Sequence, residues 1–128
     1  MRQTLPKSII LRGYQSFTKV ISSGTALHGT LLTAFLLTNA DDRKVLIGFS
    51  VPKKQVPLAA HRNRIKRLMR EVVRRDFSGV ITAAEGKDLG ARIVLMFRRD
   101  RSHDILRLTL HDLEPVWTDL RQRILKAL

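Results

Sequence analysis

A basic stretch between residues 53 and 75 carries a regular apolar pattern, and this combination constrains the fold more than any other feature of the chain. Nine of its 23 positions are Lys or Arg and one is acidic, so it supplies +8 of a formal net charge of +13. Apolar residues recur at the spacing of one helical face, at Ile65, Leu68, Met69, Val72 and Val73. The pattern predicts a helix, from His61 or Arg62 to Asp76, that packs on a core and displays positive charge elsewhere.

The polar faces of this helix are crowded with like charge. Arg62, Lys66 and Arg70 form one i, i+4 row. Such repulsion destabilises a helix unless a polyanion neutralises it. A merely solvated cationic face is the alternative, although exposed helices usually mix signs more evenly. Acidic lipids would attract the same charge, but the apolar face makes the segment part of a folded core. We therefore expect a nucleic-acid partner.

Length and composition indicate one globular domain. The chain has 128 residues, of which 44% are hydrophobic, and we expect one domain over residues 1–128 with a flexible tail at residues 1–8. Without cysteine there is no disulfide or thiolate metal site. The longest apolar run, Leu31 to Leu37, is short of the roughly 20 residues of a transmembrane helix. Polar residues interrupt any signal-peptide core, and we expect a cytoplasmic protein.

The first half of the chain predicts one helix and two strands. Gly13 is the expected N-cap of a helix that runs to Ser23, and Gly24 fits the left-handed position after its end. Strand-type residues follow from about Leu27 to Thr38 and again from Lys44 to Val51, with a turn signal at residues 39–42. These two strands are predicted to form an antiparallel pair.

The second half predicts a loop, a strand and a closing helix. Ser78 and three glycines mark a loop over residues 78–90, and Ala91 to Phe97 fits a buried strand. The last helix is expected to begin with Asp112 as its N-cap, which would keep Pro115 in the first turn. The order is helix, strands, helix, strand, helix, which is an α+β fold.

Residues capable of catalysis form no recognisable pattern. The four histidines, His28, His61, His103 and His111, lack zinc-type spacing, and no phosphate-binding glycine loop is present. The strand-rich first half does not supply the preceding helix of a helix-turn-helix DNA-binding protein. Two further hypotheses stay open at this point. One is a structural ribosomal or general RNA-binding protein without a processing role, and the other is a stand-alone nuclease that uses Asp or Glu with magnesium.

Aromatic residues in the first half have two compatible interpretations. Phe17 and Phe35 lie at helical and strand spacing, where aromatic side chains usually belong to the core. Single-stranded RNA, however, is commonly held by aromatic stacking beside basic residues such as Lys19 and Lys53. We therefore expect a second RNA-binding surface near the first helix.

At the level of whole motifs, the chain resembles the protein subunit of bacterial ribonuclease P. The resemblance rests on the run from Gly48 to Lys54, on the run from Arg62 to Glu71, and on Phe17, Val20 and Gly24. It covers about residues 9–98. It implies a two-layer α/β sandwich with a four-stranded sheet and a left-handed strand–helix–strand crossover, which departs from the general right-handed rule.

The resemblance also implies a function. The subunit would belong to a ribonucleoprotein endonuclease, a hydrolase that removes the 5′ leader from precursor tRNA. A catalytic RNA would carry out the chemistry, with Mg²⁺ held mainly by that RNA and with no catalytic residue, metal site or cofactor in the protein. The implied partners are the catalytic RNA, with 1:1 stoichiometry, and precursor tRNA, but neither DNA nor a membrane.

Two sets of site residues follow from the resemblance. The set expected to bind the catalytic RNA is Arg62, Asn63, Arg64, Lys66, Arg67, Arg70 and Arg74. The set expected to bind the leader is Phe17, Lys19, Ile21, Phe35, Ser50, Lys53 and Lys54. The sequence departs from the family pattern at Ile21, where an aromatic is frequent, at Pro52, where a small polar residue is common, and at His61, which replaces an apolar residue.

Overall fold

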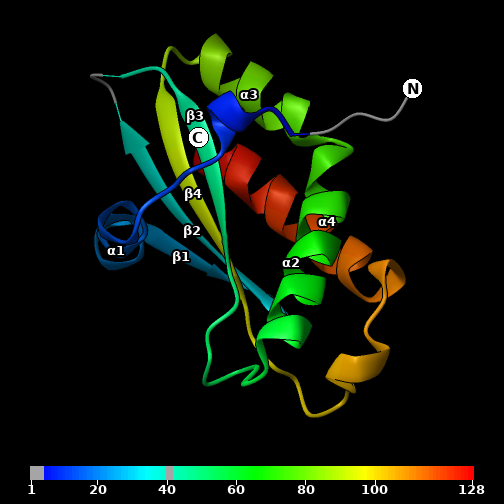
Figure 1. Ribbon diagram of the computed structural model, residues 1–128. Helices are drawn as coiled ribbons and strands as arrows, with labels where there is room; N and C mark the ends of the chain where they lie inside the picture. The colour runs from blue at the N-terminus through cyan, green and yellow to red at the C-terminus, as the bar shows by residue number, and fades with distance from the viewer. Residues whose placement is uncertain (1–4, 40–41) are drawn as a thin grey trace.

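The computed structural model describes residues 5–39 and 42–128. The elements are α1 (Tyr14–Ser23), β1 (Thr25–His28), β2 (Leu32–Asn39), β3 (Val45–Ser50), α2 (Ala59–Arg74), α3 (Phe77–Gly86), β4 (Gly90–Phe97) and α4 (Leu110–Ala127), with 3-10 turns at Lys7–Ile9 and Ile105–Arg107. Figure 1 shows the sheet between α1 and a layer that contains α2 and α4. The predicted α+β class with a four-stranded sheet is confirmed. Over the described residues, no helix is long and apolar enough to cross a bilayer.

The strand predicted over residues 27–38 is wrong, because two strands occupy that region. β1 and β2 form an antiparallel hairpin in which Thr25 faces Leu36. The chain reverses at Gly29, whose N–H donates to the carbonyl of Leu32 at 2.9 Å, and at Leu31, which has a φ of 68°. The turn thus lies at the start of the apolar run, where Leu31 takes a left-handed conformation although leucine is not a turn residue by type.

The predicted antiparallel pairing across residues 39–42 is also wrong. The strand order is β1-β2-β4-β3, with β4 antiparallel to β2 and parallel to β3. β4 takes the interior position because it is apolar on both faces, where Ile93, Val94 and Leu95 are all fully buried. The chain from β3 to β4 through α2 and α3 is thus a strand–helix–strand crossover. Ala40 and Asp41 of the predicted turn lie outside the described residues.

The glycines at the ends of α1 act differently from one another. Gly13 is the N-cap, as predicted, with a φ of 96° that favours glycine. Gly24 is extended, with a φ of −82°, so its predicted left-handed conformation is wrong. Glycine is needed at this position because there is no room for a side chain. An added Cβ would lie 2.5 Å from the carbonyl oxygen of Val20 and 2.8 Å from that of Leu36.

α2 and α3 occupy a longer helical region than the sequence predicts. α2 begins at Ala59 and ends at Arg74, so the predicted helix is confirmed with shifted ends. The loop predicted over residues 78–90 is wrong, because α3 fills most of it. Its buried residues Phe77, Val80 and Ala84 recur at helical spacing and outweigh the two glycines in that segment.

α4 begins earlier than predicted, and Asp112 is not its N-cap. Thr109 is the N-cap, and Asp112 at the third helical position completes a capping box by accepting from the Thr109 N–H at 2.8 Å. Pro115 consequently lies inside the helix and not in its first turn. Trp117, 1% exposed, anchors α4 in the core, and its indole N–H donates to Asp76 at 2.8 Å.

Side chains alternate between two apolar clusters on the two faces of the sheet. The larger cluster joins the sheet to α2, α3 and α4. The smaller one places Leu11, Val20 and Val94 together with the half-buried Phe17, Ile21 and Phe35 beneath α1. Of the predicted tail, residues 1–4 lie outside the described residues, whereas Leu5 and Pro6 lead into the first 3-10 turn, which includes Lys7 and Ser8.

Candidate nucleic-acid interface

The apolar face of α2 fixes the direction of its charged residues. Ile65, Met69 and Val73 are at most 1% exposed and pack in the larger cluster, with Leu68 half-buried beside them. Burial of this face holds the helix against the sheet layer, as the sequence pattern predicts. The cations of α2 are thereby distributed over its sides and its outer face, and they fall into two groups.

One group of arginines is engaged by the protein itself. The guanidinium of Arg62 donates to the carbonyls of Val56 and Pro57, at 3.1 and 2.6 Å. Arg64 donates to the carbonyls of Ile105 and Leu108 in the loop before α4. Both arginines are only partly exposed. Their donors brace the two loops that flank the start of α2.

Arg74 is the third engaged arginine. It forms a two-point hydrogen-bonded ion pair with Glu71, one turn earlier, and the two side chains are 18% and 23% exposed. Hydrogen bonding to Glu71 raises the pKa of the Arg74 guanidinium above its ordinary value. An arginine held in this way offers fewer free donors to an external ligand.

The second group faces outward around a shared hollow. Asn63, Lys66, Arg67 and Arg70 line a space of about 540 Å³ together with Ala60. Asn63, Arg67 and Arg70 are exposed. Arg70 also lies over the ring of Phe49, with 5.8 Å from its guanidinium carbon to the ring centroid. This hollow concentrates donors that suit phosphate oxygens.

A cleft lies between α1 and the end of β3. It measures about 410 Å³ and brings together three residues of the predicted leader set, Phe17, Ile21 and Ser50. It is also lined by four residues outside the predicted leader set, Gly13, Thr18, Phe49 and Val51. Lys66 of α2 lines both this cleft and the outward hollow. The two surfaces are therefore contiguous.

Gly48 explains how Phe17 reaches the cleft. A Cβ at Gly48 would collide with Cζ of Phe17, so the ring rests directly on the glycine backbone of β3. The ring is half-buried, with the rest available to the cleft. Phe17 therefore meets both interpretations of the sequence, because it belongs to the smaller cluster and also lines a surface.

The other predicted leader residues lie around the cleft and not inside it. Phe35 is half-buried beneath α1 in the same cluster as Phe17. Lys19 lines a separate hollow on α1, next to Leu37 and Arg92. Lys53 and Lys54 are exposed on the turn that follows β3. No sequence signal distinguishes these positions, because only the fold decides which residues of α1, of β2 and of the turn after β3 reach the cleft.

Histidine and acidic side chains meet at the start of α4 without forming a metal site. Within residues 5–39 and 42–128, no three His, Asp or Glu side chains come together as ligands of one ion. His103 lies near Asp100 and Asp112, with nitrogen–oxygen distances of 3.1 and 3.9 Å. Hydrogen bonds from Ser102 hold the pKa of Asp100 below its ordinary value. These contacts close a loop next to a capping box.

Comparison with known proteins gives the chain's relatives. A model of the Ribonuclease P family matches residues 5–120. The ribonuclease P protein component of Chlorobaculum tepidum is 37% identical over 91 residues, which make up 67% of this chain and 58% of that protein. That of Chlorobium phaeobacteroides is 37% identical over 87 residues, or 64% of this chain and 60% of that protein. The chain thus matches about three fifths of these relatives' length.

Solved structures show the same fold. The ribonuclease P protein of Thermotoga maritima matches with a TM-score of 0.67 at 23% identity, over 89% of this chain and 96% of that one. The protein of Staphylococcus aureus matches with a TM-score of 0.60 at 21% identity, over the same shares. The family match spans both the α1 cleft and α2, and on that ground this chain belongs to the Ribonuclease P family.

Proposed function

We propose that this chain is the RNA-binding subunit of ribonuclease P, which assists a catalytic RNA in removing the 5′ leader from precursor tRNA. The observation that carries the proposal is the outward hollow of α2, where Lys66, Arg67 and Arg70 gather beside the α1 cleft. Membership of the family supports the identity of the RNA partner.

The two contiguous surfaces suit two kinds of RNA. Forked arginine donors on a convex helix fit the phosphates of a folded RNA, and Asn63 adds a donor and an acceptor for a ribose or base edge. The cleft offers a half-buried aromatic ring, a serine hydroxyl and Lys66, which fit a single strand through stacking and phosphate contact. We assign the catalytic RNA to the hollow and the leader to the cleft.

Magnesium enters this proposal through charge neutralisation. Docking of two RNAs brings their phosphates together, and the repulsion is relieved by metal ions or by protein cations. Cations on α2 would take over part of that role, and the magnesium ions themselves would be held mainly by the RNA. The subunit should therefore matter most when magnesium is scarce.

Leader cleavage of precursor tRNA by the cognate ribonuclease P RNA at low magnesium tests the proposal. We expect cleavage to increase when the protein is added, with no cleavage by the protein alone. Unchanged cleavage would contradict the proposal, and cleavage by the protein alone would indicate a stand-alone nuclease. Preferential capture of ribosomal RNA from cell extract would instead favour a structural ribosomal role.

A further inference from the structure

The segment from Leu5 to Arg12 is fixed along the free edge of β3. Ile10 forms a parallel bridge with Ile47, and the N–H of Leu11 donates to the carbonyl of Ile47 at 2.8 Å. Figure 1 shows this segment running past β3 before it enters α1. Main-chain pairing therefore holds the segment at Ile10 and Leu11, and the side chains of Lys7 and Arg12 on either side of them are exposed.

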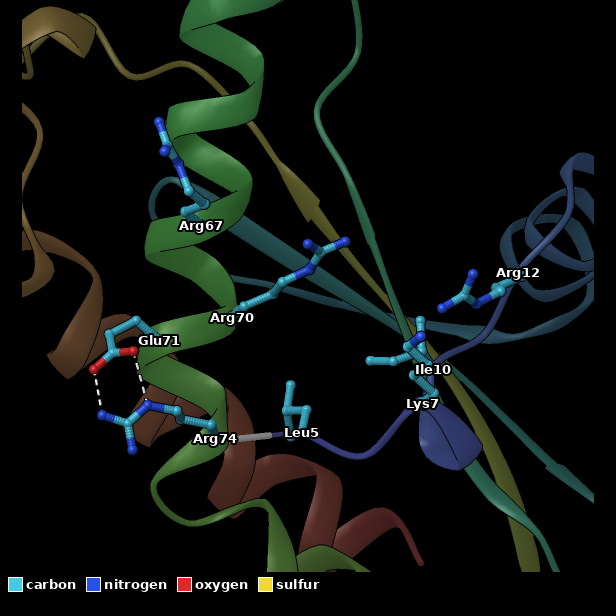
Figure 2. A pocket seen from close by; sticks show the side chains of 8 residues that line it. All are labelled: Leu5, Lys7, Ile10, Arg12, Arg67, Arg70, Glu71 and Arg74. Carbon is cyan, nitrogen blue, oxygen red and sulfur yellow. Dashed lines mark hydrogen bonds and ion pairs between the residues drawn. The ribbon is translucent and has the colours of Figure 1, made fainter. Parts of the chain in front are cut away.

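A pocket of about 500 Å³ lies between this segment and α2. Lys7 and Arg12 line it from the segment, and Arg67 and Arg70 line it from the helix. In Figure 2, Arg12 and Arg70 extend toward one another from opposite sides. The pocket is also lined by the ion pair of Glu71 and Arg74, so its side chains carry five positive charges and one negative charge.

Four cations around one hollow repel one another in the free protein. The repulsion is screened by water and salt, and it turns into attraction when an anion enters between them. Arginine forks suit phosphate oxygens, whereas Leu5 and Ile10 give the pocket an apolar wall. The volume falls in the range of about 300–1,000 Å³ that is typical of small-ligand sites. A nucleotide unit, with its sugar and phosphate, fits these features.

We propose that Lys7 and Arg12, together with Arg67 and Arg70, bind the sugar–phosphate backbone of RNA. The N-terminal segment then forms the second wall of the interface that α2 begins, and this inference rests on the proposed function. RNA is favoured over a free nucleotide because Arg67 and Arg70 line both this pocket and the outward hollow, and Lys66 joins that hollow to the cleft. A continuous row of sites matches a chain of phosphates.

The test compares the double variant Lys7→Ala/Arg12→Ala with the control Lys87→Ala/Lys126→Ala, which removes the same charge from exposed positions outside the pocket. We expect the first variant to bind the cognate ribonuclease P RNA about tenfold more weakly than the control, because charge-assisted bonds are removed. Its thermal midpoint in the absence of RNA should stay level or rise, since repulsion is relieved. Equal affinities for the two variants would overturn the proposal, and so would a fall in midpoint that accounts for the weaker binding.

A second arm separates RNA from a free phosphate compound. Inorganic pyrophosphate is added to wild type and to Lys7→Ala/Arg12→Ala, and the thermal midpoint is measured. If pyrophosphate stabilises only the wild type while both proteins bind RNA equally, the pocket serves a free phosphate compound and the proposal is wrong. Leader cleavage by wild type is measured in parallel. If wild type stimulates leader cleavage but the double variant binds RNA as tightly as the control, the proposed role of the pocket is wrong. The proposed function would still stand.

Discussion

The two groups of cations on α2 share one helix and one charge but differ in what they contact. Arg64, like Arg62, uses its donors on loop carbonyls. Arg67 and Arg70 face a hollow open to solvent. The sequence presents them all as one basic stretch. The difference teaches that charge density attracts a polyanion, whereas the environment of each guanidinium decides whether it holds the fold or is left to bind RNA.

Replacing Arg64 should produce the largest effect on stability. Arg64→Ala leaves the carbonyls of Ile105 and Leu108 without their donor, and loss of charged hydrogen bonds of this kind costs about 2 kcal/mol in the free energy of unfolding. Urea denaturation measures it, with Arg67→Ala as the matched control on the exposed face. A control that is equally destabilised would remove the distinction between the two groups.

Replacing Arg67 and Arg70, which face outward, should affect RNA binding strongly and stability only slightly. Arg67→Ala/Arg70→Ala should weaken RNA binding about tenfold or more, because two phosphate-binding forks are removed. Leader cleavage should then fall at limiting protein and recover at high protein concentration, since the proposed function leaves the chemistry to the RNA. Separating Arg70 from the Phe49 ring should change the free energy of unfolding by less than about 1 kcal/mol. Cleavage that stays low at saturating protein would contradict a role in binding alone.

Breaking the ion pair between Arg74 and Glu71 should make Arg74 resemble the outward-facing arginines, whose donors are available to RNA. Glu71→Gln removes the charge that holds Arg74 and adds one unit of positive charge to the face. We expect about a twofold gain in RNA affinity, together with a decrease of about 0.5 kcal/mol in the free energy of unfolding. Filter binding and urea denaturation measure the two quantities. An RNA affinity that falls would indicate that the pair itself orders the interface.

Acid should weaken the capping box that follows the loop held by Arg64, and it should leave the hydrogen bonds of Arg64 unchanged. The N–H of Thr109 holds the pKa of Asp112 below its ordinary value. A lowered folded-state pKa contributes stability that is present above the unfolded value of about 3.9 and disappears as pH falls through the folded value. The carbonyls that accept from Arg64 do not titrate.

The acid dependence can therefore be assigned by substitution. Urea midpoints from about pH 5 to pH 3 should fall less steeply for Asp112→Asn than for wild type, because one of the carboxylates with a lowered pKa has been removed. Arg64→Ala should run parallel to wild type over the same range. If the urea midpoint of Asp112→Asn falls with pH as steeply as that of wild type, the carboxylate of Asp112 is not a source of the acid sensitivity.

Local patterns predicted the helices well where one face is apolar. The seam of Ile65, Met69 and Val73 indicated α2 from the sequence alone, because helical periodicity is written within 16 residues. Strand pairing was mispredicted because β4 enters the sheet from a distant part of the chain, and its apolar sequence indicates an interior position without indicating which two strands are its neighbours. α3 was missed because its glycines resemble those of a loop.

The sequence predicted which residue types make up the candidate site. It did not predict which arginines bond to the protein itself and which face solvent. Basic residue types identified α2, and the family resemblance indicated Phe17 and Ser50, which the structure brings to one cleft. The carbonyls that engage Arg64 lie 41 and 44 residues further along the chain, so the sequence could not reveal them. Lys7 and Arg12 were overlooked for the same reason, because only the fold brings them to α2.

The salt dependence of binding to the cognate ribonuclease P RNA tests the division between the two groups most directly. Removal of one phosphate-binding cation should lower the slope of log K against log salt by about 0.7 to 0.9. We predict a decrease of about 1.4 to 1.8 for Arg67→Ala/Arg70→Ala and an unchanged slope for folded Arg64→Ala. Equal decreases per arginine replaced in the two variants, or an unchanged slope in the first, would contradict the account.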